Sequence, residues 1–174
     1  MANNSHSRYP FAPIADNDGA FLFVTDNGCY YTIELSNKHS KFDGNDLLFN
    51  NGESFEISID RQCDDPGKNP FDEAVSNTIL HILSNNIASK GDTSTFFFVC
   101  DITDGDGKLR ARKFNMWYKV ILEDLPLLEK YNFILNGFES EEFDISLLIF
   151  CNHPNKKDYM DQFEAKLTND FAKS

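Results

Sequence analysis

The chain has 174 residues, a formal net charge of −12 and a sequence pI near 4.6. This acidity disfavours general binding to nucleic acid or to an anionic membrane surface, and it favours basic partners. A hydrophobic fraction of 41% with 17 phenylalanines favours a packed globule over a disordered chain, and no apolar run is long enough to cross a bilayer.

The cysteines and the N-terminus both predict a cytoplasmic protein. The first residues lack the apolar core of a secretory signal. Cys29, Cys63, Cys100 and Cys151 are widely spaced and form no C-x-x-C pair. Cys29 and Cys100 fall in predicted strands, where a free cysteine behaves as a small apolar residue. We expect Cys100 and Cys151 to be reduced thiols even if their strands are neighbours.

The N-terminal third predicts an arm and a hairpin. Residues 1–19 show little periodicity and predict a flexible arm ahead of a single domain over 20–174. Two β-rich runs follow at 20–25 and 29–35. Asn27-Gly28 lies between them and predicts a hairpin with a type I′ turn, since both residues tolerate positive φ.

The middle of the chain predicts a strand, a helix and a second strand. Residues 54–60 alternate between apolar and polar, which is typical of a half-buried antiparallel strand, while 47–49 could form a short edge strand. A helix is expected next, with Asn69 as N-cap, Pro70 at the first helical position and Gly91 as its stop. Residues 95–100 are apolar throughout and predict an interior strand.

The C-terminal part predicts two more helices and two more strands. The second helix is expected over 108–122, the strands over 131–135 and 142–151, and a closing amphipathic helix over 155–171. The element order predicts a single α+β domain, in which a mixed, mostly antiparallel sheet carries about three helices on one face.

The loop after the interior strand holds three carboxylates, Asp101, Asp104 and Asp106. Carboxylates at a strand end can hold Mg²⁺ or Ca²⁺. The spacing is not that of an EF-hand, because the sixth position counted from Asp101 is Asp106 where that loop needs glycine. An Asp- and Gly-rich turn with Asp106 as helix N-cap explains the same residues, so we predict no metal and no cofactor.

A basic segment follows this loop directly. Five cations occupy positions 108 to 119 without an intervening acid: Lys108, Arg110, Arg112, Lys113 and Lys119. Arginines near a helix start suit a phosphate or a carboxylate, although the notable acidity of the preceding loop favours ion pairs with the three aspartates instead. Phe114, Trp117 and Tyr118 lie on the same helix, where they pack in the core or stack on a ligand.

The run from Phe71 to Trp117 resembles an uncharacterised family of small Bacteroidota proteins. The matching features are Thr78-Ile79 with Ile82, Cys100-Asp101 followed by Asp104-Gly105, and Ala111-Arg112 with Phe114 and Trp117. A front hairpin with Tyr30-Tyr31 also fits. The resemblance implies a bacterial, cytoplasmic, single-domain protein and carries no activity with it.

These patterns favour a binding domain over an enzyme. No G-x-S-x-G sequence and no Gly-rich phosphate loop is present. We predict a contact with another protein, for which a basic partner suits the acidic surface, and a role like that of an immunity protein or antitoxin. The candidate binding residues are Asp101, Asp104, Asp106, Lys108, Arg110, Arg112 and Trp117.

Two alternatives stay open. One is metal-assisted phosphoester hydrolysis, with the 101–106 loop holding the metal and Arg110 or Arg112 holding the phosphate. The other is a nucleic-acid contact through the basic 108–119 helix, which the overall acidity makes the less favoured of the two.

Overall fold

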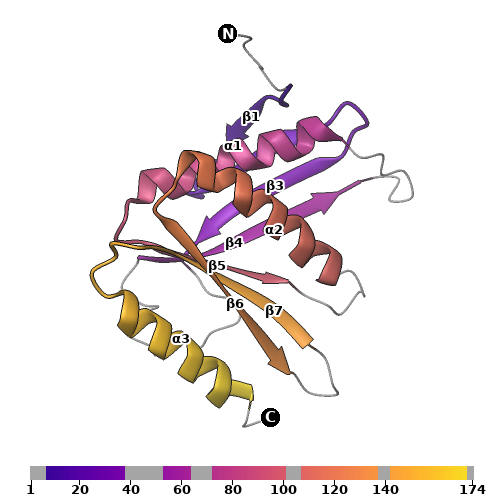
Figure 1. Cartoon of the computed structure of the whole chain (residues 1–174). Helices are drawn as coiled ribbons and strands as arrows, with labels where there is room; N and C mark the ends of the chain where they lie inside the picture. The colour runs from indigo at the N-terminus through magenta and orange to yellow at the C-terminus, as the bar shows by residue number, and fades with distance from the viewer. Residues whose placement is uncertain (1–6, 38–52, 64–71, 101–106, 137–141, 172–174) are drawn as a thin grey trace.

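The computed structural model describes residues 7–37, 53–63, 72–100, 107–136 and 142–171. Within these ranges the chain forms a sheet of seven strands in the order β1-β2-β3-β4-β5-β7-β6 (Figure 1). The strands are β1 Phe11–Pro13, β2 Ala20–Val24, β3 Tyr30–Ser36, β4 Ser54–Gln62, β5 Thr95–Cys100, β6 Leu128–Asn136 and β7 Glu142–Phe150. The helices are α1 Glu73–Lys90, α2 Gly107–Asp124 and α3 Lys156–Phe171.

Neighbouring strands are antiparallel with one exception. β4 and β5 run parallel, and α1 makes the crossover between them. The predicted α+β fold, with its mixed and mostly antiparallel sheet and three helices, is therefore confirmed. The segment 47–49, expected as a short edge strand, lies outside the described residues.

The helices lie on both faces of the sheet, so the expectation of helices on one face is wrong. In β5, Phe96 and Phe98 pack in the core with α1 and α2, whereas Phe97 packs in a second cluster with Met160 of α3. Successive side chains of a strand point to opposite faces. A strand that is apolar at every position needs cover on both faces, and α3 supplies the second layer (Figure 1).

The first hairpin is confirmed, but its predicted type I′ turn is wrong. β2 and β3 pair antiparallel, with Val24 opposite Tyr30. The amide of Gly28 donates to the carbonyl of Thr25 at 2.9 Å. Gly28 has a φ of 81°, whereas Asn27 is not among the residues with positive φ. A longer loop with one left-handed glycine makes the reversal, because such a turn needs positive φ at one position only.

Part of the predicted N-terminal arm is bound to the domain. β1 pairs with β2 at the sheet edge, with Phe11 opposite Phe23. The Tyr9 amide donates to Thr78 Oγ1 at 2.8 Å, and the Tyr9 hydroxyl donates to Asp72 Oδ2 at 2.7 Å. These contacts anchor the chain ahead of β2 onto α1.

Helix α1 begins later than its sequence signals predict. Asp72 is the N-cap, and its side chain accepts from the Ala74 amide at 2.9 Å. Asn69 and Pro70, the expected cap and first helical residue, lie outside the described residues. The predicted stop is confirmed, since Gly91 ends the helix with a φ of 84°.

A disulfide joins Cys29 to Cys63, with their Cα atoms 4.4 Å apart. The β3–β4 register places Tyr30 opposite Gln62, so the residues just outside this pair meet as well. The expectation that Cys29 is a free apolar cysteine is therefore wrong. Cys100, which is buried, and Cys151, which is exposed, form no disulfide, as predicted.

Candidate functional site

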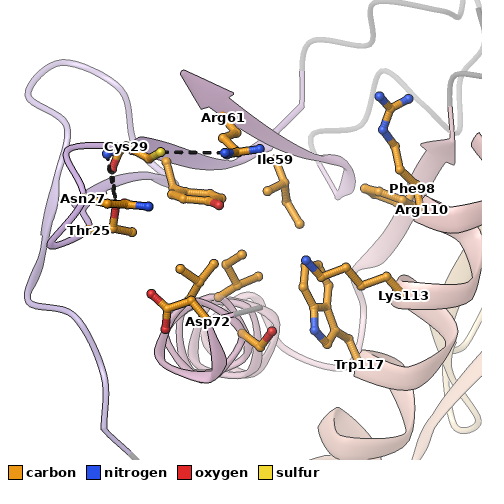
Figure 2. Close-up of a pocket in the computed structure, with 14 residues that line it drawn as sticks. Thr25, Asn27, Cys29, Ile59, Arg61, Asp72, Phe98, Arg110, Lys113 and Trp117 are labelled. Atoms are coloured by element: carbon orange, nitrogen blue, oxygen red, sulfur yellow. Dashed lines mark hydrogen bonds between the residues drawn. The ribbon is translucent and has the colours of Figure 1, made fainter. Parts of the chain in front are cut away.

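A pocket of about 410 Å³ lies between the sheet and the N-terminal parts of α1 and α2 (Figure 2). Its strand side comes from β3, β4 and β5, and the loop between β2 and β3 adds polar groups. The lining residues are Thr25, Asn27, Cys29, Tyr31, Ile59, Arg61, Asp72, Val75, Ser76, Ile79, Phe98, Arg110, Lys113 and Trp117. We call this space the pocket.

Apolar side chains form much of the pocket wall. Val75 and Ile79 are buried and lie one helical turn apart on α1. Phe98 and Trp117 reach the pocket from β5 and α2, and each is 9% exposed. Because all four also belong to the main hydrophobic core, the wall is held by core packing. Such a wall suits a flat apolar group.

Arg61 brings a positive charge to the strand side of the pocket. It continues the inward-facing positions of β4, following Phe55, Ile57 and Ile59. Its Nη2 donates to Cys29 Sγ at 3.8 Å. Its Nε is buried and has no hydrogen-bond partner among the described residues. An unpaired buried donor is costly, so this nitrogen favours an acceptor that enters from outside.

Lys113 brings a second positive charge, from the α2 side. Its Nζ lies 5.0 Å from the centroid of the Trp117 ring, the residue one turn later on the same helix. Burial lowers the pKa of the Lys113 ammonium from its ordinary value, and the positive charge of Arg61 lowers it further. Figure 2 shows Arg61 on the strand side and Lys113 with Trp117 on the helix side.

The carboxylate of Asp72 lies at the start of α1, where neutral donors hold it. The Tyr9 hydroxyl and the Ala74 amide both donate to it. The hydrogen bond with Asp72, helped by burial, raises the pKa of the Tyr9 hydroxyl above its ordinary value. Asp72 thus caps the helix, and no ion pair among the described residues joins it to Arg61 or Lys113.

The structure divides the residues predicted from the sequence into three groups. Asp101, Asp104 and Asp106 lie outside the described residues. Lys108 and Arg112 are exposed on α2 and do not line the pocket, whereas Arg110 and Trp117 do. The guanidinium of Arg110 points away from the centre of the pocket (Figure 2).

One further prediction concerns the aromatic residues of α2. Phe114 and Trp117 pack in the core as expected, and the Tyr118 hydroxyl donates to the Leu128 carbonyl at 3.0 Å.

Among the described residues, no three His, Cys, Asp or Glu side chains gather closely enough to hold a metal ion. No helix in the described ranges has both the length and the apolar character needed to span a bilayer.

Sequence reasoning missed Arg61 and Tyr31 as pocket residues. The signal for Arg61 was present, because the alternation of 54–60 continues by one step and places residue 61 on the inward face. The signal for Tyr31 was absent, since its partners come from segments far apart in the chain.

No protein-family model, no curated protein and no solved structure matches the chain. The resemblance to the Bacteroidota family therefore stays a prediction.

Proposed function

We propose that the chain is a binding domain whose pocket takes a small organic anion. The ligand class is a carboxylate or phosphate attached to a flat apolar body. The observation that carries the proposal is the buried Nε of Arg61, which has no hydrogen-bond partner among the described residues. A ligand oxygen would satisfy this donor, and guanidinium groups bind carboxylate and phosphate especially well.

The charges around the pocket support an anion over a neutral ligand. Arg61 and Lys113 are close enough for the charge of Arg61 to lower the pKa of the Lys113 ammonium. No carboxylate among the described residues pairs with either of them. An entering anion would relieve this repulsion, while the apolar body of the ligand would contact Phe98 and Trp117.

Calorimetric titration with benzoate and phenyl phosphate tests the proposal, with benzyl alcohol as the neutral probe. We expect the wild-type chain to bind at least one anion and to bind the alcohol far more weakly. Arg61→Met should weaken anion binding by roughly 10- to 100-fold, because a charge-assisted hydrogen bond contributes about 1.5–3 kcal/mol.

Arg112→Met is the matched control, because Arg112 is an exposed arginine of α2 outside the pocket. It should leave anion affinity unchanged. The proposal fails if the alcohol binds as well as the anions. It also fails if Arg61→Met, folded by circular dichroism, binds them as tightly as the wild type does.

Three earlier predictions remain separate from this proposal. They are the contact with a basic protein, the metal-assisted hydrolysis by the 101–106 loop, and the cytoplasmic location. The Cys29–Cys63 disulfide bears on the last, because disulfides persist mainly in oxidising compartments. Trapping the thiols with an alkylating agent during cell lysis would show whether the pair is oxidised in its native compartment.

A further inference from the structure

The outward surface of α2 carries an exposed apolar stripe. Leu109, Met116 and Val120 are 62%, 63% and 43% exposed. At about 100° per residue they fall within an arc of roughly 40° on the helix. A neighbouring face, centred roughly 110° further round the helix, carries Phe114, Trp117 and Ile121, which are buried in the core. α2 is therefore apolar on two sides, and core packing accounts for only one of them.

Cations border this stripe. Lys108, Arg112 and Lys119 are all exposed and lie beside it on one flank, and Lys113 lies on the other. No ion pair within the described parts of the chain engages these four side chains. This basic and apolar surface belongs to a chain with a net charge of −12, so it differs sharply from the average surface of the molecule.

We infer that the outward surface of α2 docks an acidic amphipathic helix of another protein. The apolar residues of that helix would cover Leu109, Met116 and Val120, and its carboxylates would meet Arg112 and Lys119. Paired helices commonly combine an apolar seam with flanking charges that select the partner. This inference does not rest on the proposed function, although Lys113 borders the stripe and also lines the pocket.

Charge decides between this occupant and two others. In a symmetric dimer through α2, the cations flanking one stripe would face the same cations on the second copy, which is unfavourable. A nucleic acid would satisfy Arg112 and Lys119 but would leave the three apolar side chains without an apolar partner. An acidic amphipathic helix complements both features of the surface.

The probe is a synthetic helical peptide with leucine at its a and d positions and glutamate at e and g. A second peptide with lysine at e and g is the charge control, and a DNA duplex tests the nucleic-acid alternative. Titration into ¹⁵N-labelled full-length chain, followed by amide NMR shifts, gives affinity and location together. We expect the acidic peptide to bind, to shift amides over 108–120 and to lose affinity as salt rises.

Met116→Asp should weaken binding of the acidic peptide at least about tenfold, because it places a carboxylate against the apolar seam and the glutamates. Leu127→Asp is the matched control, since Leu127 is 53% exposed but lies outside α2, and it should bind as the wild type does. Arg61→Met should also leave peptide binding unchanged.

Four results would each overturn the inference. They are no binding of the acidic peptide, equal binding of the lysine peptide, a Met116→Asp variant that binds normally, and tighter binding of the duplex at the same amides.

Discussion

At the residue scale, Arg61 and Lys113 place two positive charges in a partly buried space. Each positive charge disfavours the charged form of the other side chain. Burial and the charge of Arg61 both disfavour the protonated form of Lys113, so its pKa lies below the ordinary lysine value. An anion bound between the two side chains would interact favourably with both positive charges. The pKa of Lys113 should therefore respond both to the removal of Arg61 and to the binding of an anion.

We predict that Arg61→Met raises the pKa of Lys113 towards its ordinary value, because the second of the two causes is removed. NMR of ¹³C-methylated lysines, with Lys113→Gln to assign the signal, measures this pKa directly. Benzoate or phenyl phosphate should raise it in the wild type. If the Lys113 signal titrates identically in the variant, Arg61 does not act on it.

The direction of the pH dependence follows from this lowered pKa. Because the unfolded chain holds the Lys113 proton to higher pH than the folded chain does, this group makes stability rise with pH between the folded and the unfolded pKa. Anion affinity should change in the opposite direction. It should fall as pH rises through the pKa of Lys113, since the ammonium loses its charge.

At the element scale, two glycines with positive φ differ in what surrounds them. Gly19, just before β2, has a φ of 97°, and a Cβ there would lie 2.7 Å from the Leu35 carbonyl oxygen. Its own carbonyl accepts from the Leu35 amide at 3.0 Å. Gly28 has a φ of 81°, but a Cβ there would meet nothing within 4 Å.

We therefore predict that Gly19→Ala destabilises the chain more than Gly28→Ala. The second substitution should cost about 1 kcal/mol for the left-handed backbone alone. The first adds a clash with backbone that must move, and should cost about 3 kcal/mol. Urea denaturation of both variants measures the difference in free energy of unfolding. An equal loss in the two variants would show that the backbone at Gly19 and Leu35 moves apart without a cost in stability.

Local patterns in the sequence predict the individual helices and strands well, but they do not predict how these elements pack against one another. The alternation in 54–60 and the continuous apolar run of 95–100 predict β4 and β5, because each pattern reports how its own strand is buried. The side on which α3 packs depends on which sheet face the other helices already cover. Nothing within residues 156–171 records that choice.

The site shows the same division. Arg110 and Trp117 could be singled out because clustered charge and aromatic residues stand out along the chain. Arg61 and Tyr31 become site residues only because β3 and β4 pair in a particular register and face α2. The Cys29–Cys63 disulfide has the same origin, since 34 positions separate its two cysteines.

At the scale of the whole molecule, the disulfide closes the long connection between β3 and β4. A loop of this length predicts a stabilisation of about 3–4 kcal/mol from restricting the unfolded chain. We expect the Cys29→Ala, Cys63→Ala double variant to lose about that much free energy of unfolding in urea. A Cys151→Ala variant is the control, because Cys151 is exposed and unpaired, and it should lose almost nothing.

Thiol titration gives a second, independent check. The folded wild type should react rapidly only at the exposed Cys151, and the unfolded but unreduced chain should also react at Cys100. Cys29 and Cys63 should react only after a reductant is added. Reaction of all the cysteines in the unreduced chain would show that the pair is not bonded.

The crossover through α1 has a consequence for the growing chain on the ribosome. β1 to β5 and α1 all precede residue 101, so five of the seven strands can assemble while the rest is still being translated. Lys113 and Trp117 emerge later, and β7, which occupies the free edge of β5, later still. A nascent chain stalled before α2 would therefore hold Arg61 beside an open space, and the anion would find its full set of contacts only once translation had passed α2.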